Sequence, residues 1–430
     1  MSPRSVNGIA ADDEIVKQFV QHFASACTND SASRAEILKA NYMQMRANYC
    51  GLPDDPRYSF DAELVENVIL KMKRGKAAGL DGITLEHLRF SHWLLSCVLS
   101  KLYNFMLRLA HVPYWFGLSY TVPVIKNSTY MYSKTITVDD FRGVSISPVL
   151  SKVLEHCILD RYCDFLGTSD NQFGFKRGLS CSSAIFTLRT VVDHYVNYGS
   201  TVNVCSLDLS KAFDRMNHHA LFIKLMKRNI PVNLLSILEL WFSVSMTCVK
   251  WGRVYSDYFS LLCGVRQGGV LSPCLFTIFI DSVVDRVRNS GLGCHLKMAC
   301  FSILLYADDI VLLAPSVHSL QLLLRTCEDE LSCLDMRLNN KKSVCIRIGP
   351  RYKADCCSLV TSDNCELRWC NSLRYLGVYI MFLSTFRCSF SYFKQSTYRA
   401  FNALFGRVGR ATSADAIVQL FKMKCLPVLL

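Results

Sequence analysis

Two adjacent carboxylates within an apolar run constrain this chain more than any other feature of its sequence. The run spans Phe301–Ala314 and reads FSILLYADDIVLLA, with Asp308 and Asp309 near its centre. Both flanks are short, apolar and compatible with β-structure, so we expect two buried strands joined by a turn at Tyr306–Asp309. Charges buried in this way are costly unless a cation compensates them, and a divalent metal is the usual solution. A surface β-turn is the alternative that these four residues leave open.

A second stretch of the same kind lies upstream. Residues Thr201–Asp214 read TVNVCSLDLSKAFD, so an apolar strand again ends on an acid, Asp208. One hundred residues separate Asp208 from Asp308, which is enough chain to bring the two strand ends together in one sheet. Aspartates from neighbouring strands can hold two divalent ions about 4 Å apart, an arrangement that activates a hydroxyl and stabilises leaving pyrophosphate. The pair therefore predicts polymerase chemistry.

A third motif allows the pattern to be compared with a known family. Residues Gly264–Pro273 read GVRQGGVLSP and match the template-and-nucleotide motif of reverse transcriptases. Tyr306–Asp309 resembles the catalytic box of these enzymes, and Leu207–Asp214 resembles the first palm motif of their non-LTR retrotransposon members. The resemblance runs from about residue 60 to at least residue 380, and the Jockey and CR1 groups are the most similar.

The resemblance implies a catalytic centre with two metal ions. Asp208, Asp308 and Asp309 are expected to hold two Mg²⁺ ions, with Mn²⁺ as a possible substitute. Lys342 lies in a segment, LNNKKSVCI at residues 338–346, that resembles the motif whose lysine approaches the triphosphate. It is expected to donate a proton to pyrophosphate.

The resemblance also implies a deoxynucleotide site. Lys126 and Arg142 are expected to grip the triphosphate, for which a point charge and a guanidinium fork are well suited, although Lys126 alone could be a solvated lysine at a strand end. Phe213 is expected to pack under the sugar and exclude a 2′-hydroxyl. Gln267 is expected to bond near that sugar, and Gly268 to leave space for the base pair.

Two further segments are expected to hold the RNA template and the DNA primer. Lys176 and Arg177 lie in a stretch that resembles the template-facing fingers motif and should contact phosphates. Tyr375, Leu376 and Gly377 belong to a stretch that resembles the primer grip.

Charge and cysteine content agree with an intracellular nucleic-acid partner. The chain has 48 Lys and Arg against 35 acids, a formal charge of +13, which favours a polyanion only because the motifs already do. Its 21 cysteines are scattered, so neither a disulfide framework nor a zinc site is expected. No signal peptide or long apolar segment is evident, so we expect a nuclear or cytoplasmic protein without a membrane partner.

The expected fold is an α+β right-hand polymerase, with helical fingers, an antiparallel palm sheet backed by helices, and a partial helical thumb. Helical spacing predicts amphipathic helices at residues 13–26, with Asp12 as a possible cap, and at residues 61–73. A basic helix is expected at residues 393–410. Four segments are expected: an N-terminal helical extension without a chemical signature (1–59), an N-terminal fingers segment (60–105), the reverse transcriptase domain (106–380) and a partial thumb (381–430).

The leading function is thus RNA-directed DNA synthesis with deoxynucleotides, in retrotransposition. A relative of group II intron or telomerase enzymes is the second enzymatic reading. An inactive or domesticated remnant that binds nucleic acid is the alternative from another class, and the end of the chain soon after the first thumb residues favours it. The sequence does not indicate the oligomeric state.

Overall fold

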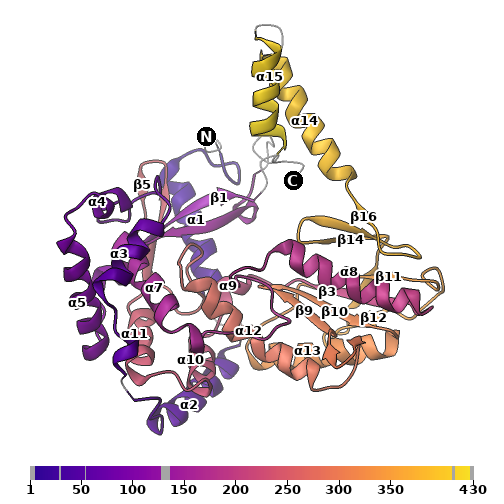
Figure 1. Cartoon of the computed structure of the whole chain (residues 1–430), viewed down its shortest axis with the longest axis horizontal. Helices are drawn as coiled ribbons and strands as arrows, with labels where there is room; N and C mark the ends of the chain where they lie inside the picture. The colour runs from indigo at the N-terminus through magenta and orange to yellow at the C-terminus, as the bar shows by residue number, and fades with distance from the viewer. Residues whose placement is uncertain (1–4, 29–30, 54, 127–135, 409–411, 427–430) are drawn as a thin grey trace.

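The computed structural model describes residues 5–28, 31–53, 55–126, 136–408 and 412–426. Figure 1 shows two lobes side by side: a mainly helical lobe at the left, and a lobe built around a sheet at the right. The helices α14 (Ser391–Val408) and α15 (Ala414–Leu420) project above both lobes. This arrangement agrees with the expected hand of fingers, palm and partial thumb.

The central sheet of the palm, the lobe at the right of Figure 1, carries the two acidic stretches. Its strand order is β12-β13-β11-β3-β10-β9. The strands are β3 (Val202–Leu207), β9 (Ile303–Tyr306), β10 (Asp309–Ala314), β11 (Val344–Ile348), β12 (Leu359–Val360) and β13 (Glu366–Trp369). The predicted hairpin is confirmed as β9–β10, and β3 lies antiparallel to β10 as expected. The sheet is not wholly antiparallel, because β13 pairs with β11 in parallel.

This sheet is buried on both faces. One face packs against α12 (Ser272–Arg288) and α13 (Val317–Cys333), and the other against α8 (Cys181–Asn197) and the hairpin of β14 (Ser372–Tyr375) and β15 (Val378–Met381). In β10, Leu312 faces the first layer and Leu313 the second. Burial on both faces explains why β10 is continuously apolar rather than alternating.

The fingers lobe contains a second, smaller sheet. An antiparallel hairpin is formed by β1 (Leu118–Ile125) and β2 (Phe141–Ile146), and β1 also pairs in parallel with β4 (Met246–Trp251). The short strands β5 (Val254–Tyr255) and β6 (Phe259–Ser260) both pair with β4. Part of the connection between β1 and β2, residues 127–135, lies outside the described residues.

Helices surround this smaller sheet and extend the core to the palm (Figure 1). They are α3 (Ala62–Lys71), α4 (Leu85–Arg89), α5 (Leu94–Leu109), α6 (Tyr114–Gly117), α7 (Val149–Arg161), α9 (Ala212–Arg215), α10 (His218–Lys227) and α11 (Val232–Ser243). The predicted helix at residues 61–73 is α3; it begins one residue later because the Asp61 carboxylate caps its first turn by accepting from Leu64 N, and it ends at Lys71. Two short hairpin strands, β7 (His295–Leu296) and β8 (Ala299–Cys300), follow α12, and β16 (Cys388–Ser389) pairs with β15.

The N-terminal extension forms two helices, of which the sequence predicted one. The first, α1 (Asp12–Ala26), packs Phe19 between Phe141 and Trp251. Asp12 is its first residue and not its cap; the cap position belongs to Ala11, which makes no side-chain cap bond.

The second helix of the extension, α2 (Ala32–Ala47), was missed because none of its residues is fully buried and only a narrow row, Leu38, Tyr42 and Met45, packs against the core. Polar contacts also attach it to α11. The Tyr42 hydroxyl and Arg46 Nε donate to Glu239 at 2.6 Å and 3.0 Å.

The basic helix predicted at residues 393–410 is confirmed as α14, which begins two residues earlier; Arg410 lies outside the described residues. Among the residues that the structure describes, no helix combines the length and apolar character needed to cross a bilayer.

Candidate active site

Seven of the residues singled out from the sequence line one cavity of about 410 Å³ between the palm sheet and the fingers hairpin. They are Lys126, Arg142, Asp208, Phe213, Gln267, Asp308 and Lys342. They come from segments as much as 216 residues apart in the chain (342 − 126), and the pairing of β3 with β10 and of β1 with β2 brings them together. Asp309, Gly268 and the expected template and primer residues do not line this cavity.

The two aspartate stretches converge through strand register. Leu207, the residue before Asp208, pairs with Ile310, while Asp309 pairs with Tyr306 across the hairpin. Asp208 and Asp308 therefore emerge at the same end of neighbouring strands. The convergence that the sequence predicted is confirmed.

The site concentrates negative charge. Burial raises the pKa of Asp308 above its ordinary value, and the nearby charge of Asp208 raises it further. Burial raises the pKa of Asp309 to about 6, with Asp308 and Asp208 adding to the effect. Arg142 and Lys342 act in the opposite direction on Asp308 but do not overcome these causes. The carboxylates therefore lack full compensation by the protein's own cations.

This excess of negative charge fits a hard divalent cation. Asp208, Asp308 and Asp309 offer only oxygen ligands, the type that Mg²⁺ and Mn²⁺ prefer. Within the described part of the chain, no three side chains of His, Cys, Asp or Glu are already drawn together as a metal-binding group. The donor chemistry fits the ion, but the carboxylates are not assembled around one.

A loop before β11 positions Asp208. Asn339 N donates to the Asp208 carbonyl at 2.8 Å, and Asp208 N donates to Ser343 Oγ at 3.2 Å. Lys342, in the same loop, places its Nζ 3.6 Å from Asp208 Oδ2. The predicted lysine is therefore adjacent to the predicted metal ligand.

The fingers hairpin supplies the opposite wall. Lys126 follows β1 directly, and its Nζ donates to the Asp139 carbonyl at 2.6 Å. Burial of its ammonium lowers the pKa of Lys126, and the charge of Lys342 lowers it further. Arg142 lies on β2 opposite Val124. With Lys211 and Lys342, four cationic side chains line the cavity, as a polyphosphate would require.

Phe213 and Gln267 occupy the floor of the cavity. Phe213 is half-buried and stacks on Phe276, with ring centroids 4.5 Å apart. Gln267 Nε2 donates to Asp214 Oδ1 at 2.8 Å, so the amide is already engaged within the protein. Burial raises the pKa of Asp214, a residue to which the sequence assigned no role in the site.

Gly268 fulfils a packing requirement. Its φ is +126°, and a Cβ added there would lie 2.5 Å from the Ser145 carbonyl oxygen of β2. Ser145 N in turn donates to the Gln267 carbonyl at 2.7 Å. A side chain at position 268 would therefore separate the Gln267 loop from the fingers hairpin.

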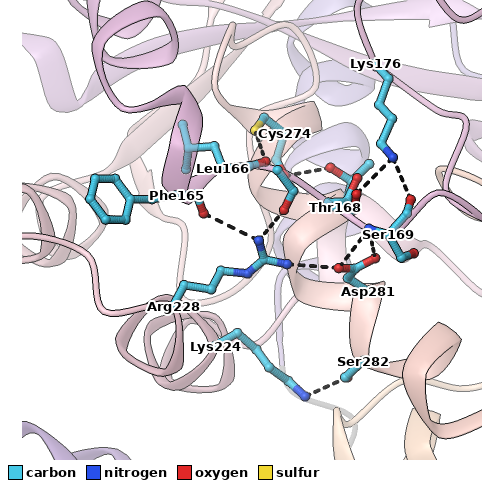
Figure 2. Close-up of polar contacts among 12 residues, drawn as sticks. Phe165, Leu166, Thr168, Ser169, Lys176, Lys224, Arg228, Cys274, Asp281 and Ser282 are labelled. Carbon is cyan, nitrogen blue, oxygen red and sulfur yellow. Dashed lines mark hydrogen bonds and ion pairs between the residues drawn. The ribbon is translucent and has the colours of Figure 1, made fainter. Parts of the chain in front are cut away.

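The expected template residues lie apart from the catalytic cavity. Lys176 and Arg177 line a separate cavity of about 590 Å³ among α3, α7 and α12. Figure 2 shows that the Lys176 ammonium is turned toward the backbone, where it donates to the Thr168 and Ser169 carbonyls at 2.9 Å and 2.5 Å. Arg177 is exposed. Phosphate contact by these two residues stays a prediction.

The expected primer residues form the turn between β14 and β15. Leu376 and Gly377 have φ of +44° and +89°, as a tight hairpin turn of the primed type requires. The Tyr375 side chain is buried, and the charge of Asp309 adds to burial in raising the pKa of its phenol. The β14 end of this turn therefore lies near Asp309, one of the predicted metal ligands, and contact with a primer stays a prediction.

Sequence reasoning missed a contribution from the N-terminal extension. His22, Phe23 and Ala26 of α1 line the catalytic cavity. His22 Nδ1 lies 3.7 Å from Asp139 Oδ1, yet burial and the charge of Lys211 lower the pKa of His22. The sequence held no signal for this role, because helical periodicity predicts that α1 packs against something but not against what.

Comparison with known proteins agrees with this geometry. Residues 125–380, more than half of the chain, match the family described as reverse transcriptase (RNA-dependent DNA polymerase). The chain is 26% identical over 326 residues to the retrovirus-related Pol polyprotein from type-2 retrotransposable element R2DM of Drosophila melanogaster, covering 74% of this chain and 30% of that protein. It is also 26% identical over 350 residues to the RNA-directed DNA polymerase from mobile element jockey of Drosophila funebris, covering 78% and 36%.

This chain therefore spans about a third of the length of these relatives. Among solved structures, apo telomerase from Candida tropicalis, truncated from its C-terminal domain, aligns with 68% of this chain and 60% of its own. The identity is 14% and the TM-score 0.42, so we base no argument on that likeness.

Proposed function

Because the chain belongs to the reverse transcriptase (RNA-dependent DNA polymerase) family, we propose that it extends the 3′-hydroxyl of a primer with deoxynucleotides on an RNA template, in retrotransposition. The observation that carries the proposal is the meeting of Asp208 and Asp308 in a cavity that Lys126, Arg142 and Lys342 also line. Carboxylates and cations that line the same cavity suit phosphoryl transfer, in which catalysis consists mainly of positioning and charge stabilisation.

Each group has a role in this reaction. Asp208, Asp308 and Asp309 would hold two divalent ions, which when bound activate the attacking hydroxyl and stabilise the leaving oxygen. The protein's own cations act on the nucleotide: Lys126 and Arg142 neutralise and orient its triphosphate.

Lys342 and Phe213 complete the nucleotide site. The Lys342 ammonium, 3.6 Å from Asp208, would give a proton to pyrophosphate as it leaves. Stacking on Phe276 restricts movement of the Phe213 ring. A 2′-hydroxyl on the incoming sugar would therefore clash with this ring. That contact favours deoxynucleotides over ribonucleotides.

The direct test is primer extension on an oligonucleotide-primed RNA with purified protein, with and without magnesium. Asp208→Asn and Asp308→Asn should each abolish extension and leave primer–template affinity within about twofold, because phosphate contacts elsewhere supply most of that affinity. Asp257→Asn, at an exposed position outside the cavity, is the matched control and should extend normally. Normal extension by either site variant would refute the assignment. Binding without extension by the unaltered protein would favour the inactive, nucleic-acid-binding alternative.

A further inference from the structure

A buried glutamine contacts the catalytic turn from a segment that the sequence assigned to the template. Residues Gln172–Phe175, within the stretch that resembles the template-facing motif, lie along the outer edge of β9. Phe173 N donates to the Leu305 carbonyl at 2.8 Å, and Leu305 N donates to the Asn171 carbonyl at 2.9 Å. The segment thus continues the palm sheet beyond β9 and lies next to the turn that carries Asp308.

The Gln172 side chain is fully buried at this edge. Its Oε1 accepts two backbone N–H groups, from Gly174 at 2.8 Å and from Ala307 at 3.1 Å. Ala307 is the residue immediately before Asp308 and has a φ of +57°, in the left-handed region. For a residue with a Cβ, that conformation costs about 1–2 kcal/mol and persists only where the surroundings hold it.

Close packing reinforces this contact. A Cβ added to Gly174 would lie 2.4 Å from Ala307 N and 3.1 Å from Gln172 Oε1. Only glycine lets the backbone approach the turn so closely. Within the described residues, the buried Gln172 Nε2 has no hydrogen-bond partner. The side chain therefore contributes through its amide oxygen, and the unpaired amide nitrogen is a destabilising feature that this contact outweighs.

The other end of the segment is anchored to the palm helices. Asp281 of α12 accepts from Ser169 N at 3.0 Å and from Arg228 of α10 at 2.9 Å, and Arg228 also donates to the Gly167 carbonyl (Figure 2). Gln172 therefore acts from a segment that is fixed at both ends. A fixed acceptor can hold a strained backbone, whereas a mobile one cannot.

We propose that Gln172 is a positioning residue for the polymerase reaction: its amide oxygen holds Ala307 in the left-handed conformation and thereby sets the direction of the Asp308 carboxylate. The inference rests on the proposed function for its kinetic consequence. Its structural part, the hold on Ala307, can be tested without any activity.

The test uses a near-isosteric variant and a matched control in the same segment. Gln172→Met keeps the length of the side chain and removes the acceptor. Asn171→Leu removes two different buried bonds, to the Cys300 and Ile303 carbonyls at 3.0 Å and 2.8 Å, and leaves Ala307 untouched. Comparing the two at matched thermal stability separates positioning from general loss of stability.

Two measurements follow. Hydrogen exchange at the Ala307 amide should accelerate at least tenfold in Gln172→Met and change less than twofold in Asn171→Leu. Single-nucleotide addition should lose roughly 10- to 100-fold in kcat in Gln172→Met, because small misplacements of reacting groups cost this much. The KM for dNTP and the primer–template Kd should stay within about twofold.

Gly174→Ala should reproduce the loss of kcat by pushing the turn away, and it serves if Gln172→Met does not fold. Equal kcat for Gln172→Met and Asn171→Leu, or unchanged exchange at Ala307, would overturn the inference. If the unaltered protein does not extend a primer, the proposed function fails instead, and the exchange measurement alone decides the role of Gln172.

Discussion

Asp309 offers a test in which loss of activity should accompany a gain in stability. Burial and two neighbouring carboxylates raise its pKa from an ordinary 3.8 to about 6. The folded protein therefore binds a proton at Asp309 more tightly than the unfolded chain does. This tighter proton binding contributes fully to the free energy of unfolding below about pH 4, and the contribution is lost as pH rises through about 6. The ionised carboxylate therefore destabilises the metal-free protein at pH 7.

The magnitude follows from the pKa difference. A pKa difference of roughly 2 corresponds to about 3 kcal/mol at pH 7. Asp309 is partly exposed, and solvent screening reduces this to about 1–2 kcal/mol. Asp309→Asn should therefore raise the free energy of unfolding by about 1–2 kcal/mol at pH 7.5 in EDTA, and the thermal midpoint of a chain of this length by roughly 1–2 °C.

The assay is thermal unfolding from pH 4.5 to 8 in EDTA, with primer extension measured in parallel with magnesium. The gain in stability should vanish toward the low end of this pH range, where the unaltered carboxyl is protonated. Added magnesium should reduce it as well, because an ion that binds the native carboxylates stabilises only the unaltered protein. Asp257→Asn, exposed at the surface, controls for the removal of one negative charge. A gain that is absent at pH 7.5, or that does not change with pH, would refute the reasoning.

Three further predictions concern the nucleotide, the Gln267 loop and the duplex. Phe213→Val should raise the ratio of ribonucleotide to deoxynucleotide incorporation at least tenfold; an unchanged ratio in a stable variant would make Phe213 a core residue only. Glu155→Gln should lower the free energy of unfolding by about 1–3 kcal/mol, since this buried carboxylate accepts backbone N–H groups at 2.5 Å and 2.8 Å in the loop before α12; urea unfolding measures the change. Replacing Lys394, Arg399 or Arg407 of α14 by Ala should each reduce the salt slope of primer–template binding by about one if they contact phosphates, and an unchanged slope would exclude that contact.

The elements nearest the catalytic carboxylates were the easiest to predict. The β9–β10 hairpin and β3 could be predicted from the sequence because strands buried on both faces are apolar. An acidic residue at the end of an apolar run is therefore a clear signal. The helix α2 was not predicted, since its apolar face is narrow and only partly buried, and Arg46 and Tyr42 also attach it by polar contacts to the distant Glu239. Helix boundaries shifted by one or two residues for local reasons, such as the Asp61 cap of α3.

Residues of the site divide in the same way. Asp208, Asp308 and Lys342 were named from the sequence, and the cavity contains all three. His22 and Gln172 were not named with a catalytic role, because each owes its position to a partner far along the chain: His22 to Asp139, and Gln172 to Ala307. Periodicity and local motifs report on neighbours within one element and carry no information about such contacts.

The sequence by itself determined which reactions this protein could support, because only particular side chains can hold a divalent ion or a triphosphate. The types of these side chains and their order are properties of the sequence. The tertiary structure alone decided their orientation. Strand register placed Leu207 opposite Ile310 and so joined the two acids. The Gln172 contact selected a left-handed Ala307, which no local preference would choose. Such choices depend on through-space packing and hydrogen bonds between distant segments, and these exist only once the chain has folded.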